Sequence, residues 1–544
     1  MRRAVAYGAR AAIVAGAALL QACGGDAATT GNDAARPAPV QKPTREPTRE
    51  PTREPTQEPV PAERPSTADA ASRRERPPVP DAIPGPVDAA ALDPMVRAAI
   101  EAAQDAVRAG TVEGSDPGRD AGARWLELAD LLLAHGEPAG AAIAYTGALA
   151  LLPERDDAVE RASYLRAVAL EDSGDSAAAL AALEAIAPRS RTPQVHWRLA
   201  LALAADGRLD EAIAAAQRAT GLAPRDMRAQ AALAQVASEA GAWEIAVRAA
   251  RAGLDANPRN GHLYGILAAS LRALGDESNE AERFTGAGRF SRADWLDPWL
   301  AALRDLRLGA GAARERFYEA LRKNDAEAAR RELDAFDGSG AQPARAALMR
   351  AQLAVSAGDA AGARASLADA AGDGTTPCEV AVVRAMVDLR QAVAASTVAS
   401  IVATLESTPC EGDQDATRLE LVGNIRLAQG EFAGAAEALI AADEAREGGV
   451  GAAIRKAVVA MERAKAYGPA TMLLDRLVVA EPLNPEPCFL LGVIALRSGD
   501  LDAAKRQAAR LAELAPTNPK TRQLLEQIER ALGGGQGAAG RRGA

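Results

Sequence analysis

A repeat of 34 residues restricts the fold of this 544-residue chain more than any other feature of its sequence. Successive copies begin at residues 193, 227 and 261, and each carries Ala and Gly at the same offsets. The residues that recur are Ala200, Gly207, Ala234, Gly241, Ala268 and Gly275. Apolar residues within each copy follow the i, i+3, i+4 and i+7 spacing of a helix face. One such unit cannot bury its apolar face alone, so the copies are expected to stack.

The copy that starts at Gly122 shows the pattern in its fullest form. Its residues are Trp125, Leu128, Ala129 and Leu132, followed by Gly136, Ala141, Tyr145, Ala148 and Pro153. This pattern resembles the consensus of the tetratricopeptide repeat. The resemblance implies two antiparallel helices per copy, with Gly in the turn between them and Pro after the second helix. The predicted fold class is therefore all-α: an α-solenoid of about eleven such repeats behind a disordered, lipidated N-terminal tether.

The repeats fall into two arrays that are separated by a break in the phase. Five copies are expected in an N-terminal array over residues 122–294, and six in a C-terminal array over residues 310–518. An interrupting helix that contains Trp is expected at 295–309. The other predicted parts are a signal peptide at 1–22, a tether at 23–88, a leading helix and loop at 89–121, a capping helix at 519–533 and a disordered tail at 534–544.

The composition supports helices and excludes several functions. Hydrophobic residues make up 48% of the chain but aromatic residues only 3%, and Ala, the best helix former, takes their place. The net charge of −10 argues against nucleic acid as a partner, because phosphate binding needs clustered Lys and Arg. His135, His196 and His262 stand in different repeats, so we expect no metal and no cofactor. The sequence contains no phosphate-binding loop and no nucleophile motif, so we expect no enzyme activity.

The N-terminus has the features of an export signal. A stretch with three Arg residues precedes an apolar run at 11–20, which is too short to span a bilayer because a spanning helix needs ~20 residues. The following Leu-Gln-Ala-Cys motif, which ends at Cys23, resembles the lipobox of bacterial lipoproteins. The resemblance implies that Cys23 is lipidated, and that Gly24 in place of Asp directs the protein to the outer membrane, facing the periplasm. The alternative is an ordinary secreted protein with an incidental Cys.

A proline-rich segment follows the export signal. Residues 43–58 hold three copies of Pro-Thr-Arg-Glu and one degenerate copy, and Pro at every fourth position favours a polyproline II conformation. At ~3.1 Å per residue, the stretch 43–86 reaches on the order of 130 Å when fully extended. We interpret it as a solvated tether, with a cell-wall or peptide ligand as the alternative.

Three further cysteines lie within the repeats. Cys378 and Cys410 occur in matching Thr-Pro-Cys-Glu segments at the start and the end of one repeat, which a helix hairpin brings to the same end. In an exported protein this arrangement predicts a disulfide, and two free thiols are the alternative. Cys488 takes a position that faces the hairpin interior, so we expect a buried, unreactive thiol.

The break between the arrays contains a Trp pair. Asp297 and Pro298 have the residue types of a helix N-cap and first position, and Trp295 and Trp299 flank them. We expect the Trp pair to fill the joint between the arrays, with a ligand site at the joint as the alternative.

The resemblance also implies a binding face. In tetratricopeptide arrays the first helix of each repeat lines a concave groove. The corresponding residues here are Leu126, Asp130, Leu133, Tyr164, Val168, Trp197, Leu201 and Gln235. Their aromatic and apolar side chains suit an amphipathic helix or extended peptide, whereas the Lys and Asn set of a carboxylate clamp is missing. The alternative is that Tyr164 and Trp197 merely pack between repeats.

Two functions fit these features. The first is a lipid-anchored, non-catalytic scaffold that binds a protein or peptide partner in the bacterial cell envelope. The second is an envelope enzyme or ligand-binding protein whose site lies in the degenerate middle region 295–415. A middle region built of ordinary helix pairs without a polar pocket would favour the first.

Overall fold

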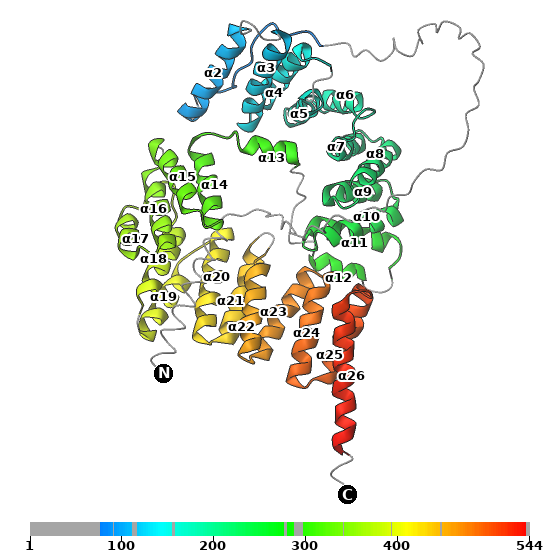
Figure 1. Ribbon diagram of the computed structural model, residues 1–544, viewed down its shortest axis with the longest axis vertical. Helices are drawn as coiled ribbons and strands as arrows, with labels where there is room; N and C mark the ends of the chain where they lie inside the picture. Colours follow the sequence, from blue (N-terminus) through cyan, green and yellow to red (C-terminus); the bar gives the residue numbers. More distant parts are fainter. Residues whose placement is uncertain are drawn as a thin grey trace, which may run out of the picture.

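A computed structural model describes residues 77–90, 92–110, 117–154, 158–276, 280–287, 297–340, 342–392, 394–446 and 449–539. These residues form the helices α2 to α26 and contain no strand (Figure 1). The predicted all-α class and the solenoid of paired helices are confirmed. The signal peptide, Cys23, the tether as far as residue 76, and Trp295 lie outside the described residues.

The N-terminal array begins with a leading helix, α2 (Pro94–Ala109). Five helix pairs follow in its described residues: α3 (Pro117–Ala134) with α4 (Pro138–Leu151), α5 (Ala158–Asp172) with α6 (Ser176–Ile186), α7 (Pro193–Ala205) with α8 (Leu209–Leu222), α9 (Met227–Glu239) with α10 (Trp243–Ala256), and α11 (Gly261–Ala273) with α12 (Glu280–Ala287). A short single helix, α13 (Pro298–Arg304), stands between the two arrays in the sequence.

The described part of the C-terminal array holds six pairs, which brings the total to the eleven predicted. They are α14 (Gly309–Arg322) with α15 (Ala326–Gly338), α16 (Pro343–Ala357) with α17 (Ala360–Ala368), α18 (Pro377–Gln391) with α19 (Ala395–Ser407), α20 (Gly412–Gln429) with α21 (Phe432–Ala445), α22 (Gly451–Arg463) with α23 (Tyr467–Ala480), and α24 (Pro485–Ser498) with α25 (Leu501–Leu514). A last helix, α26 (Pro519–Ala539), covers the end of the array.

Small residues allow the two helices of a pair to approach closely. The fourth residue of the second helix is a fully buried Ala in many pairs: Ala141, Ala212, Ala246, Ala435, Ala470 and Ala504. The turn before the second helix needs a left-handed backbone, as at Gly207 with φ 81°. In two pairs of the C-terminal array this conformation is taken by Asn324 and Lys465, with φ 57° and 61°. The repeat therefore fixes the turn even where its glycine has been lost.

The two arrays start side by side and meet again further along. At the start, α14 contacts α2, and the Asp93 carboxylate accepts hydrogen bonds from Met95 N (2.9 Å) and Ala310 N (3.1 Å). Asp93 therefore caps the first helix of each array. Further along, α12 contacts α23, so the arrays follow a closed circuit (Figure 1).

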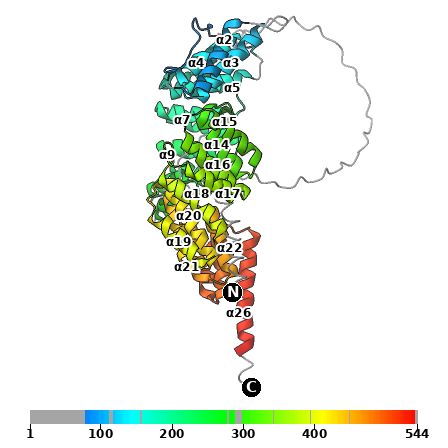
Figure 2. The same ribbon diagram turned by 90° about the vertical axis from the view of Figure 1, so that its left-hand side faces the viewer.

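Both ends of the described chain differ from expectation. Residues 77–88 were expected to belong to the tether, but this stretch lies against α2 and the start of α4. Pro84 O accepts a hydrogen bond from Gln104 Nε2 (2.8 Å), and Val87 N donates one to Glu137 (2.9 Å). At the other end, α26 continues to Ala539, six residues beyond the predicted end at 533, and extends away from the arrays (Figure 2). Within the described residues, no helix has the length and apolar character needed to cross a membrane.

Candidate functional site

The predicted groove residues all lie on the first helices of the N-terminal array, but three of them are buried. Tyr164, Val168 and Trp197 expose 0%, 2% and 1% of their surface. The remaining ones are half-buried: Leu126, Asp130, Leu133, Leu201 and Gln235. The prediction that Tyr164 and Trp197 are open anchors for a partner is therefore wrong. Trp197 packs within the array, against Ala219, Ala229 and Ala232.

Tyr164 is buried because helix α13 returns to the N-terminal array and covers it. Helix α13 contacts α3 and α5, the first helices of the first two pairs. The Tyr164 hydroxyl donates to Asp297, and the rings of Tyr164 and Trp299 meet edge to face at 5.1 Å between centroids. The Trp segment was expected at the joint between the arrays; instead, Trp299 lies on the inner face of α5.

The hydroxyl of Tyr164 is held in one orientation. Arg198 Nε donates to it at 3.0 Å, which leaves its proton for Asp297. Burial raises the pKa of Tyr164, the Asp297 carboxylate adds to the rise, and Arg198 opposes it. The phenol therefore stays protonated and acts as a donor. Asp130, also predicted to line the groove, instead accepts from Tyr145 (2.6 Å) and pairs with Arg161 (2.9 Å).

The corresponding face of the C-terminal array is open and contains a cavity of about 370 Å³. Its walls come from the first helices α14, α16, α18 and α20 and from the segment after α21. The polar lining residues are Arg314, Tyr318, Arg345, Gln352, Glu379, Asp413, Gln414, Thr417 and Arg446, and the apolar ones include Val382, Val383 and Met386. The degenerate middle thus folds as ordinary helix pairs and also carries a polar pocket.

Most charges of this cavity are paired within the protein. Arg345 binds both carboxylate oxygens of Glu379, at 2.7 and 2.9 Å, and its Nε donates to Gly374 O at 2.6 Å. Arg446 pairs with Glu420, whose pKa is raised by burial even though Arg446 lowers it. These pairs fix the walls of the cavity.

Gln352 is a buried polar lining residue whose acceptor is not satisfied within the described residues. Its side chain is 6% exposed, and its Oε1 has no hydrogen-bond donor among the described residues. A buried acceptor without a donor costs about 1–3 kcal/mol. Gln352 therefore marks where a ligand that offers an N–H group gains affinity.

The sequence contained a signal for this cavity that our interpretation missed. Arg345 and Glu379 are spaced by 34 residues, so they occupy one position in successive repeats and lie side by side. Gln352 follows Arg345 by seven residues, which places both on one helix face. Polar residues at two such positions of a repeat predict a polar inner face.

Cys378 and Cys410 lie beside the same cavity. The structure joins Cys378 and Cys410 in a disulfide with a Cα–Cα distance of 5.4 Å, and Cys378 lines the cavity. The bond connects the start of α18 with the segment between α19 and α20. Helix α19 buries only Ile401 and Leu405 among its residues, so the disulfide holds a weakly packed helix. Cys488 is a buried thiol whose pKa is raised by burial, as expected for an unreactive position.

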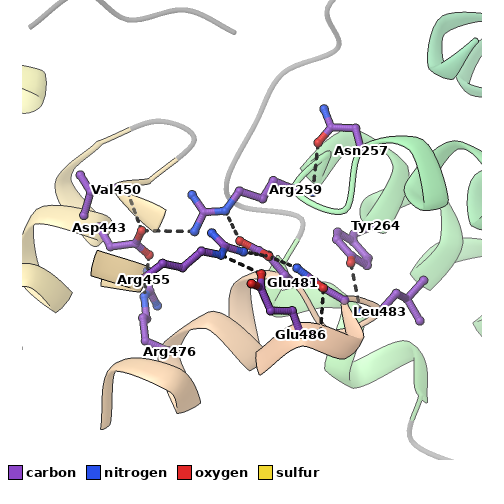
Figure 3. A network of polar contacts seen from close by, with 11 residues as sticks. Asn257, Arg259, Tyr264, Asp443, Val450, Arg455, Arg476, Glu481, Leu483 and Glu486 are labelled. Carbon is purple, nitrogen blue, oxygen red and sulfur yellow. Dashed lines mark hydrogen bonds and ion pairs between the residues drawn. The ribbon is translucent and has the colours of Figure 1, made fainter. Parts of the chain in front are cut away.

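A network of buried charges joins the two arrays a second time (Figure 3). Arg259, from the loop between α10 and α11, donates to Glu481 and lies 3.6 Å from Asp443. The two carboxylates are 1% and 0% exposed. Arg455 also binds Glu481 at 2.6 Å, and Arg476 binds Asp443 at 3.0 Å. Burial alone would raise the pKa of Glu481, but Arg259 and Arg455 outweigh it and lower the pKa.

The C-terminal array leaves room for the Arg259 side chain. A Cβ atom added to Gly451 would stand 2.4 Å from Arg259 Nη2, and one added to Gly449 would stand 3.0 Å from Nη1. Beside this contact, Leu483 N donates to the Tyr264 hydroxyl at 3.3 Å (Figure 3). Nothing in the repeat pattern indicated this contact, because the paired residues are 222 positions apart.

The three histidines lie apart and have structural contacts. His135 accepts from Leu308 N at 3.3 Å, and a ring nitrogen of His196 lies 3.1 Å from Ser190 O. Burial lowers the pKa of His262. The described residues hold no group of His, Cys, Asp and Glu side chains that could bind a metal ion.

Comparison with known proteins identifies the repeat in one part of the chain. The family model described as the tetratricopeptide repeat matches residues 160–226, which cover most of α5 to α8. No curated protein sequence matches this chain.

Several solved structures are similar to this chain. The MamA protein is 20% identical over 30% of this chain and 87% of its own, with a TM-score of 0.27. YrrB, described as a TPR protein with an unusual peptide-binding site, is 16% identical over 42% of this chain and 100% of its own, with a TM-score of 0.28. A tetratricopeptide repeat protein from Parabacteroides merdae is 12% identical over 50% and 99%, with a TM-score of 0.28.

Proposed function

We propose that this chain, a solenoid that carries tetratricopeptide repeats, is a non-catalytic scaffold anchored by lipid in the bacterial cell envelope. Its partner is a protein or peptide that binds in the cavity of the C-terminal array. The observation that carries the proposal is Gln352, a buried side chain that lines the cavity and whose carbonyl oxygen has no donor among the described residues. The backbone N–H of a bound peptide supplies the missing hydrogen bond.

The chemistry of the cavity supports binding rather than catalysis. Glu379, a lining carboxylate, is held by both arms of Arg345 and also caps helix α18 through Thr376. A carboxylate fixed in this way stabilises the wall and is poorly placed to exchange a proton with a substrate. Arg314 on α14 and Asp413 on α20 also line the cavity and can contact charged groups of the partner.

The envelope location rests on the N-terminal signal and on the disulfide. Cys23 ends a motif that resembles a lipobox, and the proline-rich segment after it would separate the solenoid from the membrane. The Cys378–Cys410 disulfide suits the same location, because disulfides persist in oxidising compartments. By the same resemblance, Gly24 favours the outer membrane, with the solenoid facing the periplasm.

A second candidate is a small-ligand-binding protein with its site in the middle region. The cavity volume of about 370 Å³ favours it, because small-molecule pockets begin at about 300 Å³. The backbone N–H of a peptide and an N–H of a small molecule would use the same Gln352 contact, so the experiment must separate them.

Site-specific photo-crosslinking in intact cells tests the scaffold. A photo-reactive residue at Asp413, which is exposed at the cavity, should crosslink one protein partner. The same residue at Asp502, exposed on α25, should not. Gln352→Leu should abolish the Asp413 crosslink. Crosslinks that persist in Gln352→Leu would disprove the site, and a small-molecule adduct that Gln352→Leu removes from the purified protein would favour the second candidate.

The lipid anchor has a separate test. Cys23→Ala should move the protein from the detergent-extractable membrane fraction to the soluble envelope fraction, because the acyl chains provide the membrane affinity. Labelled fatty acid should join the wild-type chain but not this variant. If the wild-type chain never takes up the label, the lipobox interpretation is wrong.

A further inference from the structure

Residues 297–303 bind the N-terminal array in the way that a separate ligand binds a receptor. Figure 1 shows α13 on the inner side of the arrays, away from the helix pairs that precede it in the sequence. Its contacts are with α3 and α5, more than 100 residues earlier in the chain. The distance in sequence between Tyr164 and Asp297 is 133 residues.

The first element of this contact is a carboxylate. Asp297 is 1% exposed, and one of its oxygens accepts the hydrogen bond of Tyr164. Its other oxygen caps α13 by accepting from Trp299 N (2.8 Å) and Leu300 N (3.0 Å). Arg198, which also pairs with Glu171 at 2.7 Å, donates to the Tyr164 hydroxyl and so directs the proton of that hydroxyl to the carboxylate. The array therefore recognises a carboxylate that begins a helix.

The second element is an apolar face. The Trp299 ring meets the ring of Tyr164 edge to face, with 62° between the planes. One turn later, Leu303 is 4% exposed within the core of the N-terminal array, and Leu300 packs against the same core. The carboxylate, the indole and the leucine lie along one side of a single short helix.

Helix α13 is suited to leave the face that it covers and to be replaced there by another segment. It has seven residues, a length at which a helix is unstable in water without a surface to pack on. Trp299 and Leu300 are only half-buried, and Ala302 and Arg304 are exposed. Leu303 is the one residue within α13 that is buried in the continuous core of the helix pairs, so the departure of α13 would leave most of that core in place.

We propose that α13 is an internal ligand of the N-terminal array, and that the face it covers binds a partner segment of the same chemistry. Such a segment is a short helix with Asp at its N-cap, Trp two residues later and Leu one turn further on. The partner binds when it displaces α13. This site lies on the other array from the cavity, so it goes beyond the proposed function and can fail without affecting it.

A synthetic peptide with the sequence of residues 297–306, acetylated and labelled with a fluorophore, tests this inference. In the full-length wild-type protein, α13 occupies the face at an effective concentration on the order of 1 mM, so the peptide should bind weakly. In full-length Asp297→Ala/Trp299→Ala protein, the face is vacated. Fluorescence anisotropy should then show binding at least about tenfold tighter. Equal affinity for the two proteins, or no binding to either, would overturn the proposal.

Two controls establish that the binding uses the described contacts. In the vacated protein, Tyr164→Phe should weaken binding of the peptide by about fivefold or more, because the donor to the carboxylate is lost. Tyr145→Phe removes an equally buried hydroxyl that bonds Asp130 rather than Asp297, and should leave the affinity unchanged. Peptides with Ala in place of Asp or Trp should not bind. Equal effects of the two Tyr variants would contradict the site.

Hydrogen exchange tests the proposal even if the double variant folds poorly. In the wild-type protein, the amides of 301–304 should exchange at least about tenfold faster than those of 162–169 in α5, because α13 leaves the face without unfolding the pairs. Equally slow exchange of the two segments would show that α13 is a fixed part of the core.

Discussion

Val195 in the N-terminal array and Arg345 in the C-terminal array are each the third residue of a first helix. Each stands two residues after a proline that begins a first helix, Pro193 and Pro343. Val195 is fully buried among apolar neighbours, whereas Arg345 forms an ion pair with Glu379, the equivalent residue of the next repeat. Seven residues further on, the N-terminal array has Ala202 and the C-terminal array has Gln352.

The comparison shows how one backbone provides two kinds of surface. In the N-terminal array, apolar side chains at these positions join the core, and the inner face is covered by α13. In the C-terminal array, ion pairs between successive repeats replace the apolar contacts and leave a polar cavity. Both arrays share the backbone of paired helices, and the residue types on the inner face decide whether that face is closed or open.

The largest difference between the arrays should appear when the disulfide is removed. Cys378→Ser/Cys410→Ser should lower the free energy of unfolding of the C-terminal array by about 3–4 kcal/mol, by the chain-entropy estimate for a loop of ~33 residues. All five Trp residues, at 125, 197, 243, 295 and 299, precede the C-terminal array, which begins with α14 at Gly309. Trp emission should therefore follow the N-terminal array in urea, while circular dichroism follows both arrays.

In Cys378→Ser/Cys410→Ser, part of the helical circular dichroism signal should be lost at a lower urea concentration than in the wild-type protein. The unfolding transition followed by Trp emission should occur at an unchanged urea concentration. A shift of both signals together would mean that the arrays unfold as one unit, and the comparison would fail. Alkylation of the unreduced wild-type protein should leave both cysteines unmodified. Ready labelling of both after mild unfolding without reductant would exclude the bond.

The Arg345–Glu379 ion pair of the C-terminal array can be replaced by apolar side chains of the kind that fill the N-terminal array. Arg345→Val alone should cost about 2–3 kcal/mol, because it leaves Glu379 partly buried without its cation. Arg345→Val/Glu379→Val should recover most of that loss, since an apolar pair can replace a buried ion pair. Urea unfolding followed by circular dichroism measures both. A double variant as unstable as the single one would show that an apolar pair cannot replace the ion pair at these positions.

The contact that joins the arrays at Arg259 should depend on pH. The pKa of Glu481 is lowered in the folded protein, so its stabilising effect is complete above the ordinary Glu pKa of about 4.3. The stabilisation is lost as the pH falls through the lower folded value. Hydrogen exchange at the Leu483 amide, which donates to Tyr264 across the contact, reports the opening.

At neutral pH, Arg259→Ala should lower the protection of Leu483 by about tenfold, or about 1.5 kcal/mol, because a hydrogen-bonded charge partner is lost. Gly451→Ala should have a similar effect by displacing the guanidinium. Arg248→Ala, at an exposed position on α10, serves as the control and should change nothing. Unchanged protection of Leu483 in both Arg259→Ala and Gly451→Ala would show that apolar packing alone holds the arrays together.

The sequence was informative where the repeat itself sets the structure. Gly207, Ala212 and their equivalents predicted the helix pairs and their number, because backbone geometry and close packing restrict those positions to small residues. Burial of Tyr164 was not predictable, since its cover comes from 133 residues further on. Arg259 and Glu481 meet only because the superhelices of two arrays converge, and small rotations accumulated over many repeats decide that.

The smallest expected effect concerns a turn in which the two arrays differ by one residue. Gly207 and Lys465 stand at the same point of their pairs, both with a left-handed backbone. Such a backbone costs an L-residue other than Gly about 1 kcal/mol or more, so Lys465→Gly should stabilise the C-terminal array by about 1 kcal/mol. Gly207→Ala should destabilise the N-terminal array by a similar amount, although no heavy atom lies within 4 Å of the added Cβ. Unfolding followed by circular dichroism should detect the effect of Lys465→Gly, and unfolding followed by Trp emission should detect the effect of Gly207→Ala. If Lys465→Gly brings no gain, the Lys side chain contributes contacts that offset the backbone cost, and the turn of the C-terminal array differs from its N-terminal counterpart in more than its glycine.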